Sequence, residues 1–198
     1  MWAKRLVDVV LSALGLLLLA PLLLAIALWI KLDSPGQVLF RQERVGRRGR
    51  LFSIHKFRTM RPDAPSLGLQ ITIGADPRVT RAGQLLRRYK LDELPQLWDV
   101  LRGAMSLVGP RPEVPRYVAL YPAELAELVL SVRPGITDLA SIEYRDESPL
   151  LGEAADPEAC YTEQVMPAKL ALAARYVRTR SFSGDLVLLL RTLKVLAR

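Results

Sequence analysis

The sequence is poor in the residues that build disulfide frameworks and metal sites. Its 198 residues include one cysteine, Cys160, and one histidine, His55. A single cysteine excludes an intrachain disulfide and fits a reducing compartment. Neither residue has the neighbouring cysteines or histidines that a zinc site requires. We therefore expect both side chains to be structural.

Several motifs of nucleotide-binding and hydrolytic proteins are also absent from the sequence. The chain contains no GxxxxGK[ST] phosphate loop, no GxGxxG after a strand and no serine nucleophile elbow. It has no zinc-finger spacing and no interleaving of aromatic and basic residues, so its positive charge does not indicate a nucleic-acid partner.

What the chain has instead is a long apolar segment near its N-terminus. Residues 9–30 are almost all Leu, Ala, Ile and Val, with Pro21 near the centre. A helix of about 22 residues reaches roughly 33 Å, which is enough for the hydrocarbon core of a bilayer. The segment is too long for an ordinary signal peptide and no small-x-small cleavage site follows it, so we expect an anchor that is retained.

Two features leave the path of this anchor through the bilayer open. Basic residues flank both ends, with Lys4 and Arg5 before it and Lys31 after it, so the positive-inside tendency assigns no outer end. Pro21 removes a backbone hydrogen bond and bends a helix. A helix that bends at Pro21 and returns is as compatible with these residues as a plain single-pass helix.

The positive charge of the chain is concentrated just after the anchor. The formal net charge is +8, and basic residues follow at positions 41, 44, 47, 48, 50, 56 and 58. Anionic lipids attract such juxtamembrane residues by about 1 kcal/mol each. The order of the two segments indicates a membrane-bound enzyme whose substrate is part lipid and part phosphate.

The remaining pattern predicts short strands and several helices. Strands are expected at 38–40 and 51–57, with a tight turn at 44–49 between them. Residues 62–77 are expected to form a loop, and residues 109–115, which contain three prolines, a stiff extended segment. Helices are expected at 80–90, 92–103, 116–131 and 158–178, and a basic amphipathic helix at 184–198.

Asp92 and Glu93 are the strongest candidates for chemistry. An acid at the start of a helix is more often a cap. Two adjacent carboxylates among arginines, however, suit a divalent cation with phosphate, and an aspartate can itself attack phosphorus. Arg111 lies between two prolines, which present its guanidinium to phosphate at a small ordering cost, although a solvated surface arginine is the alternative. Lys56 and Arg58 share one face of a strand, which is either a phosphate site or an exposed face.

These segments together resemble the bacterial sugar transferase family, the monotopic phosphoglycosyl transferases that start glycoconjugate and polysaccharide biosynthesis on a lipid carrier. The chain is similar to the short members, which consist of little more than the catalytic core, and residues after 137 match poorly. The matching segments follow the family's order: Lys4-Arg5-Leu6-Val7-Asp8, residues 34–46, Lys56-Phe57-Arg58-Thr59-Met60, Leu86-Arg87, residues 91–97, residues 105–112 and Arg133-Pro134-Gly135-Ile136-Thr137.

The resemblance implies a reaction and a role for each candidate residue. A UDP-sugar donates its phosphosugar to a polyprenol phosphate, which releases UMP and gives a polyprenyl diphosphosugar. Asp92 matches the nucleophile that forms an aspartyl-phosphosugar intermediate, and Glu93 matches a catalytic residue associated with Mg²⁺. The residues that match the family's phosphate-binding positions are Lys56, Arg87 and Arg111.

The resemblance also implies a fold and a location. The fold is α+β, with a re-entrant membrane helix hairpin at residues 1–33. Residues 34–198 form a small, mostly helical cytoplasmic catalytic domain with a short β-hairpin and interfacial amphipathic helices. The protein is expected at the bacterial inner (cytoplasmic) membrane, with the catalytic domain on the cytoplasmic face and membrane lipids as partners. A homodimer is left open.

Three departures from the family pattern stand in this chain. Ala20-Pro21 replaces the Ser-Pro pair at which the family's anchor helix is broken, so the proline is kept and the serine is not. Asp99 stands where asparagine is common, and Asp138 stands where glycine is expected. The sugar specificity of the family cannot be transferred to this chain.

Two other classes of function fit the same residues. The first is a membrane-bound phosphohydrolase that uses Asp92 with water as the acceptor. The second is a non-catalytic membrane module whose basic face binds anionic lipid or a partner protein.

Overall fold

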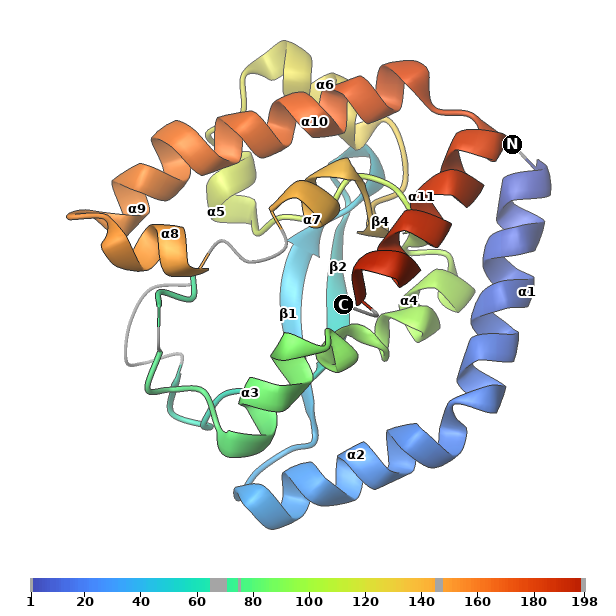
Figure 1. The fold of residues 1–198 in the computed structure, drawn as a ribbon. Helices are drawn as coiled ribbons and strands as arrows, with labels where there is room; N and C mark the ends of the chain where they lie inside the picture. Colours follow the sequence, from blue (N-terminus) through green and yellow to red (C-terminus); the bar gives the residue numbers. More distant parts are fainter. Residues whose placement is uncertain (1, 65–70, 75, 145–147, 197–198) are drawn as a thin grey trace.

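Two N-terminal helices form a bent arm along one side of the protein. Helix α1 (Trp2–Leu18) and helix α2 (Ala20–Asp33) meet at an angle of 61° and border the right and lower sides of the view in Figure 1. Pro21 lies in the first turn of α2, where it has no N–H to donate and its ring crowds the preceding turn. The predicted bend at this proline is confirmed.

The computed structural model describes residues 2–64, 71–74, 76–144 and 148–196. Among these residues, no single helix has both the length and the hydropathy of a membrane span, whereas α1 and α2 reach these values as a pair. The outer faces of the pair expose large apolar side chains, each more than half exposed: Trp2, Leu6, Leu17, Leu18, Leu24, Leu28 and Leu32. Contiguous exposed apolar surface of this kind marks contact with an apolar partner or a lipid phase.

A β-hairpin stands at the centre of the fold (Figure 1). Strand β1 (Leu39–Val45) pairs antiparallel with strand β2 (Leu51–Phe57), and a 3₁₀ turn (Arg47–Gly49) joins them. Strand β2 agrees with the prediction. Strand β1 is longer than the predicted 38–40, because backbone pairing with β2 extends it through polar residues that show no apolar alternation.

Two further strands were not predicted. Strands β3 (Ser106–Val108) and β4 (Gly135–Thr137) form a parallel pair of three residues each. Each strand is too short to show a periodic pattern. A side chain at Gly135 would clash with the backbone of Gly109, with a Cβ only 2.1 Å from its nitrogen, so the close approach of the two chains requires glycine.

The predicted helices are present with two corrections. The expected helix at 116–131 is broken into α5 (Pro115–Val118) and α6 (Ala123–Leu130), because Pro122 disfavours helical backbone in the residue before it. The expected helix at 92–103 is a 3₁₀ turn, η3 (Leu91–Glu93), followed after Pro95 by α4 (Gln96–Arg102). The helix ends at Gly103, as the predicted range has it, and this glycine adopts a left-handed conformation.

The other helices surround the hairpin. Helix α3 (Arg81–Arg88) confirms the prediction at 80–90. The predicted helix at 158–178 is present as α9 (Pro157–Cys160), a π-helical turn (Tyr161–Val165) and α10 (Met166–Thr179). The C-terminal amphipathic helix is α11 (Phe182–Leu196), and the last two residues of its predicted range lie outside the described residues, as do 65–70 and 75 of the predicted loop. Helices α7 (Leu139–Glu143) and α8 (Ser148–Glu153) were not predicted.

Polar side chains near the start of α1 fasten the arm to the rest of the protein. The Asp8 carboxylate is 4% exposed and accepts hydrogen bonds from the Ser106 hydroxyl at 2.8 Å and the Leu107 N–H at 3.1 Å. Arg5 donates to the carbonyl of Val100 at 2.8 Å, and Lys4 pairs with Asp185 on α11. These bonds join α1 to the rest of the protein. The predicted division into domains at residue 33 stays a prediction.

The other end of the arm is fastened by Arg58. Its guanidinium donates to the carbonyls of Ser34 at 2.8 Å and Pro35 at 2.7 Å, directly after α2. Arg58 is 7% exposed, so its interpretation as part of an exposed strand face is wrong. It also lines the large cavity described below, and its interpretation as a phosphate-binding residue stays a prediction. Both ends of the helix pair attach to the same body.

We expect Asp8→Ala to lower the free energy of unfolding by about 2 kcal/mol, because the Leu107 N–H and Ser106 hydroxyl remain buried without their acceptor. Denaturant titration of the detergent-solubilised chain measures this loss. Glu124→Ala, which removes an exposed carboxylate from α6, is the control and should change the midpoint little. Equal midpoints for the two variants would contradict the proposed role of Asp8.

Candidate active site

Asp92 and Glu93 lie in the 3₁₀ turn between α3 and α4. Lys90 begins this turn with a left-handed φ of 54°, which ends α3 and redirects the chain. Both carboxylates are buried, and neither caps a helix, since α4 begins after Pro95. The alternative that Asp92 is only a helix cap is wrong.

All five predicted site residues line one cavity of about 1840 Å³. Lys56 comes from β2, Arg87 from α3 and Arg111 from the extended segment that follows β3. The tertiary structure thus collects three basic side chains and two acids from four separate parts of the chain. Their individual roles stay predictions.

Glu93 is the centre of an ion cluster. Its Oε1 accepts a hydrogen bond from Lys56 Nζ at 3.0 Å, and its Oε2 accepts one from a terminal nitrogen of Arg111 at 3.0 Å. The second terminal nitrogen of Arg111 also donates to Oε1, so the arginine binds the carboxylate with both prongs of its fork. Burial by itself raises the pKa of Glu93, but Arg111 and Lys56 outweigh it and hold the pKa well below its usual range.

Asp92 has a different environment although it is the neighbouring residue. Its Oδ1 is buried and has no hydrogen-bond partner in the described part of the chain. Burial raises the pKa of Asp92, and the positive charge of Lys56 opposes this shift. Two adjacent carboxyls whose pKa values move in opposite directions are equipped for different tasks.

Arg87 faces the same cavity from α3. Its guanidinium donates to the hydroxyls of Thr59 and Thr72, each at 2.8 Å. Because both partners are neutral, Arg87 brings its positive charge to the cavity with no carboxylate of the described residues in hydrogen-bond contact. Such a cation is available to an anionic ligand.

Asp92 and Glu93 can form a metal site only if a bound ligand supplies further oxygen atoms to the ion. No group of three or more His, Cys, Asp or Glu residues comes together to bind a metal within the described ranges. Mg²⁺ commonly binds one or two protein carboxylates together with substrate phosphates. Asp92 Oδ1 accepts no hydrogen bond, and Glu93 Oε2 accepts one, so both atoms keep a lone pair for such an ion.

Arg111 and the segment around it are hydrogen-bonded to residues that the sequence did not identify as part of the site. Asp138 accepts a hydrogen bond from the Arg111 N–H at 3.2 Å, and Glu113 binds both Arg44 and Tyr161. The departure from glycine at Asp138 was the one signal in the sequence. No spacing rule connects Arg44, Glu113 and Tyr161, because they are far apart along the chain.

The structural interpretation of His55 agrees with its contacts. Its Nδ1 lies 2.6 Å from Asp99 Oδ1, and its backbone N–H donates to Asp99 Oδ2 at 2.9 Å. Both residues are buried, and their contact joins β2, which carries Lys56, to α4, which follows Asp92 and Glu93 in the chain. Cys160 is likewise buried, in a cluster of apolar side chains.

Comparison with known proteins identifies the family. A family model described as bacterial sugar transferase matches residues 1–198. The chain belongs to the bacterial sugar transferase family. The resemblance seen in the sequence motifs is therefore confirmed, and the match also includes the residues after 137, where the sequence motifs were expected to match poorly.

Relatives of this sugar transferase differ in length. It is 45% identical over 193 residues to the UDP-glucose:undecaprenyl-phosphate glucose-1-phosphate transferase of Caulobacter vibrioides, covering 96% of this chain and 67% of the relative. It is 42% identical over 200 residues to the undecaprenyl-phosphate glucose phosphotransferase of Komagataeibacter xylinus, covering 98% of this chain and 36% of the relative.

A third relative is the UDP-N-acetylgalactosamine-undecaprenyl-phosphate N-acetylgalactosaminephosphotransferase of Aeromonas hydrophila. It is 43% identical over 143 residues, which cover 71% of this chain and 34% of the relative. The sugar transferase chain thus spans only about a third of two of these relatives.

We expect Glu93→Gln to bind inorganic pyrophosphate about tenfold more tightly in metal-free buffer, because it removes a carboxylate that competes for Lys56 and Arg111. Isothermal titration calorimetry measures this gain. The control is Glu124→Gln, an exposed position on α6. Unchanged or weaker binding by Glu93→Gln would show that these cations are not where anions bind.

Proposed function

We propose that this sugar transferase moves a sugar-1-phosphate from a UDP-sugar to a polyprenol phosphate and releases UMP. The observation that carries the proposal is the unpartnered Asp92 oxygen in a cavity with Lys56, Arg87 and Arg111. The names of two relatives, a UDP-glucose:undecaprenyl-phosphate glucose-1-phosphate transferase and a UDP-N-acetylgalactosamine-undecaprenyl-phosphate N-acetylgalactosaminephosphotransferase, support the same reaction.

The reaction follows in two displacements at phosphorus. In the first, an Asp92 oxygen attacks the sugar-linked phosphorus, the bond to the bridging oxygen breaks, and UMP leaves with both electrons of that bond. In the second, an oxygen of polyprenol phosphate attacks the same phosphorus and Asp92 leaves as a carboxylate. The products are UMP and a polyprenyl diphosphosugar, and the enzyme is unchanged.

The basic residues make the first displacement feasible. A carboxylate and a diphosphate repel each other, so the approach of Asp92 needs fixed positive charge around the phosphates. Arg111 and Lys56 supply it once the diphosphate replaces Glu93 as their partner, and Arg87 supplies more from α3. Glu93 would hold Mg²⁺ together with the phosphates, and the ion would further neutralise the charge on the transferring group.

We also propose that the α1–α2 pair enters the membrane and returns on the same side. Lys4, Arg5 and Asp8 attach the start of the pair to the catalytic body, and Arg58 attaches its end. A pair with both ends on one body does not cross the bilayer. This arrangement supports a re-entrant anchor in the bacterial inner membrane, with the active site at head-group depth on the cytoplasmic face.

The location explains how a lipid substrate is met. A polyprenol phosphate has its tail in the bilayer and its phosphate at the surface. An active site held at that depth shares a plane with this phosphate, which removes part of the entropy cost of encounter.

We expect Asp92→Asn to lower UMP release from a UDP-sugar by at least about 1,000-fold, because an amide is not a nucleophile toward phosphorus. The assay is a panel of UDP-sugars with undecaprenyl phosphate and Mg²⁺. Asp63→Asn, at an exposed aspartate paired with Arg61, is the matched control. Normal turnover by Asp92→Asn, or a trapped phosphosugar on another side chain, would require a different nucleophile.

Product analysis in the same assay separates transfer from hydrolysis. A transferase forms polyprenyl diphosphosugar in proportion to the UMP released and only when the lipid acceptor is present. Sugar phosphate released at the same rate without the acceptor would indicate a phosphohydrolase that uses Asp92.

We expect removal of divalent cations with EDTA to stop UMP release and added Mg²⁺ to restore it, because the three basic side chains alone would not offset the charges of two carboxylates and a diphosphate. A circular dichroism spectrum before and after chelation controls for loss of fold. Full activity in excess EDTA would remove the metal from the mechanism.

A further inference from the structure

The segment that carries Arg111 has no regular structure of its own. Residues 109–114 belong to no helix or strand, and three prolines between 110 and 115 stiffen the backbone. Stiffness sets the local shape of the segment but not its place relative to Asp92. The position of the Arg111 guanidinium therefore depends on contacts from other elements.

Asp138 makes the first of these contacts. It is 1% exposed, and its Oδ1 accepts from the Ser141 N–H at 2.7 Å, which caps the start of α7. Its Oδ2 accepts from the Arg111 N–H at 3.2 Å. One carboxylate thus joins the backbone of Arg111 to the start of a helix.

Tyr161 makes the second contact through Glu113. The Tyr161 hydroxyl donates to Glu113 Oε2 at 2.5 Å. Glu113 Oε1 accepts from Arg44 at 3.0 Å and from the Val114 N–H at 2.7 Å. Glu113 is two residues from Arg111, so these bonds hold the extended segment from its C-terminal side.

The helix around Tyr161 is distorted at this residue. Tyr161–Val165 form a π-helical turn between α9 and α10, and Pro167 follows without an N–H to continue the α-helical pattern. A π-helical turn changes the direction in which side chains leave a helix and is frequent at functional sites. The Tyr161 ring packs on Tyr117 with centroids 4.8 Å apart, so the hydroxyl is aimed by both the turn and the packing.

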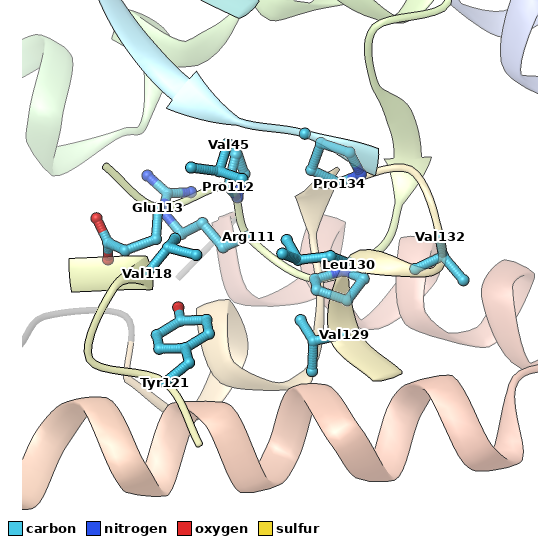
Figure 2. A pocket seen from close by; sticks show the side chains of 12 residues that line it. Val45, Arg111, Pro112, Glu113, Val118, Tyr121, Val129, Leu130, Val132 and Pro134 are labelled. Atoms are coloured by element: carbon cyan, nitrogen blue, oxygen red, sulfur yellow. The ribbon is translucent and has the colours of Figure 1, made fainter. Parts of the chain in front are cut away.

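On the side away from the large cavity, other residues fill most of the space around segment 109–114. Figure 2 shows Pro112 and Glu113 between the strand end at Val45 and the side chains of Tyr121 and Val129. The pocket there is about 20 Å³, which is room for about one water molecule. This small pocket has no room for a substrate phosphate, whereas the large cavity, which Arg111 also lines, does.

We propose that Asp138 and Tyr161 are positioning residues for Arg111. They connect the C-terminal third of the chain to the phosphate site by holding the extended segment at its two sides. The inference rests on the proposed function, in which Arg111 stabilises charge on the transferring phosphoryl group. A displacement of about 1 Å in such a group costs on the order of 100-fold in rate.

The central variant is Tyr161→Phe, which removes the hydroxyl and keeps the ring. We expect kcat for UMP release to fall about tenfold with a smaller change in KM, because the contact of Arg111 with phosphate strengthens in the transition state. Asp138→Ser should act in the same direction, since serine still caps α7 but is too short to reach the Arg111 N–H as well.

Tyr117→Phe is the matched control. It makes the same substitution in the neighbouring ring, whose hydroxyl has no hydrogen-bond partner in the described part of the structure. We expect its kcat to equal that of the unmodified chain. A tenfold fall in Tyr117→Phe would show that the effect comes from this aromatic cluster in general and would overturn the inference.

A double-mutant cycle with Arg111→Ala tests the connection itself. If Tyr161 acts through Arg111, Tyr161→Phe lowers the residual rate by less than about twofold in the Arg111→Ala background. A full tenfold further loss would overturn the inference. Should Tyr161→Phe not fold, as judged by its melting temperature, Asp138→Ser enters the same cycle.

Pyrophosphate binding separates this inference from the proposed function. With the full-length chain in metal-free buffer, Tyr161→Phe should weaken pyrophosphate binding several-fold, and the effect should vanish in Arg111→Ala. This result with no turnover of any UDP-sugar would leave the inference standing and remove the proposed function. If the unmodified chain turned over a UDP-sugar and Tyr161→Phe matched it in both kinetics and pyrophosphate binding, the proposed function would stand and the inference would be overturned.

Discussion

The contact of Glu93 with Arg111 and Lys56 is the interaction on which the rest of this site depends. It brings together a 3₁₀ turn, an extended segment and a strand that share no local sequence pattern. Buried charges are stable only when they are paired, so the three groups hold one another in the cavity wall. Asp92, next in the chain, is left with an unpartnered oxygen in the same positive environment. The two adjacent acids thus differ in their partners, although they share one cavity.

The same cluster explains how a diphosphate can be recognised by a site that is already neutralised. An arginine that binds a carboxylate with both prongs of its fork is shaped to bind a phosphate in the same way. Glu93 therefore occupies the place of an anion until a ligand with more charge replaces it. In our proposal, the hydrogen bonds from Asp138 to the Arg111 backbone and from Tyr161 to Glu113 hold the guanidinium in place during this exchange.

Local sequence patterns predicted many of the helices and strands, and the elements that they missed were missed for physical reasons. The apolar run with Pro21 predicted the bent arm, and the alternation at 51–57 predicted β2, because both patterns act over neighbouring residues. The short strands β3 and β4 were missed because three residues carry no period, and their pairing joins positions 106 and 135. The helix predicted at 92–103 was wrong at its start, where left-handed Lys90 and Pro95 produce a separate turn. The burial of Arg58 was not foreseen because its partners lie directly after α2, far from Arg58 along the chain.

By itself, the sequence determined the family, the apolar anchor and the five candidate residues at the site, because motifs and composition are properties of the chain alone. Only the tertiary structure decided which acid is paired and which keeps an open oxygen. It also decided that Arg58 serves the anchor and that Asp138 and Tyr161 support Arg111. Burial and charge pairing depend on groups that are distant in sequence, and no local pattern encodes their distances. For that reason the different surroundings of Asp92 and Glu93 emerge only in the folded chain.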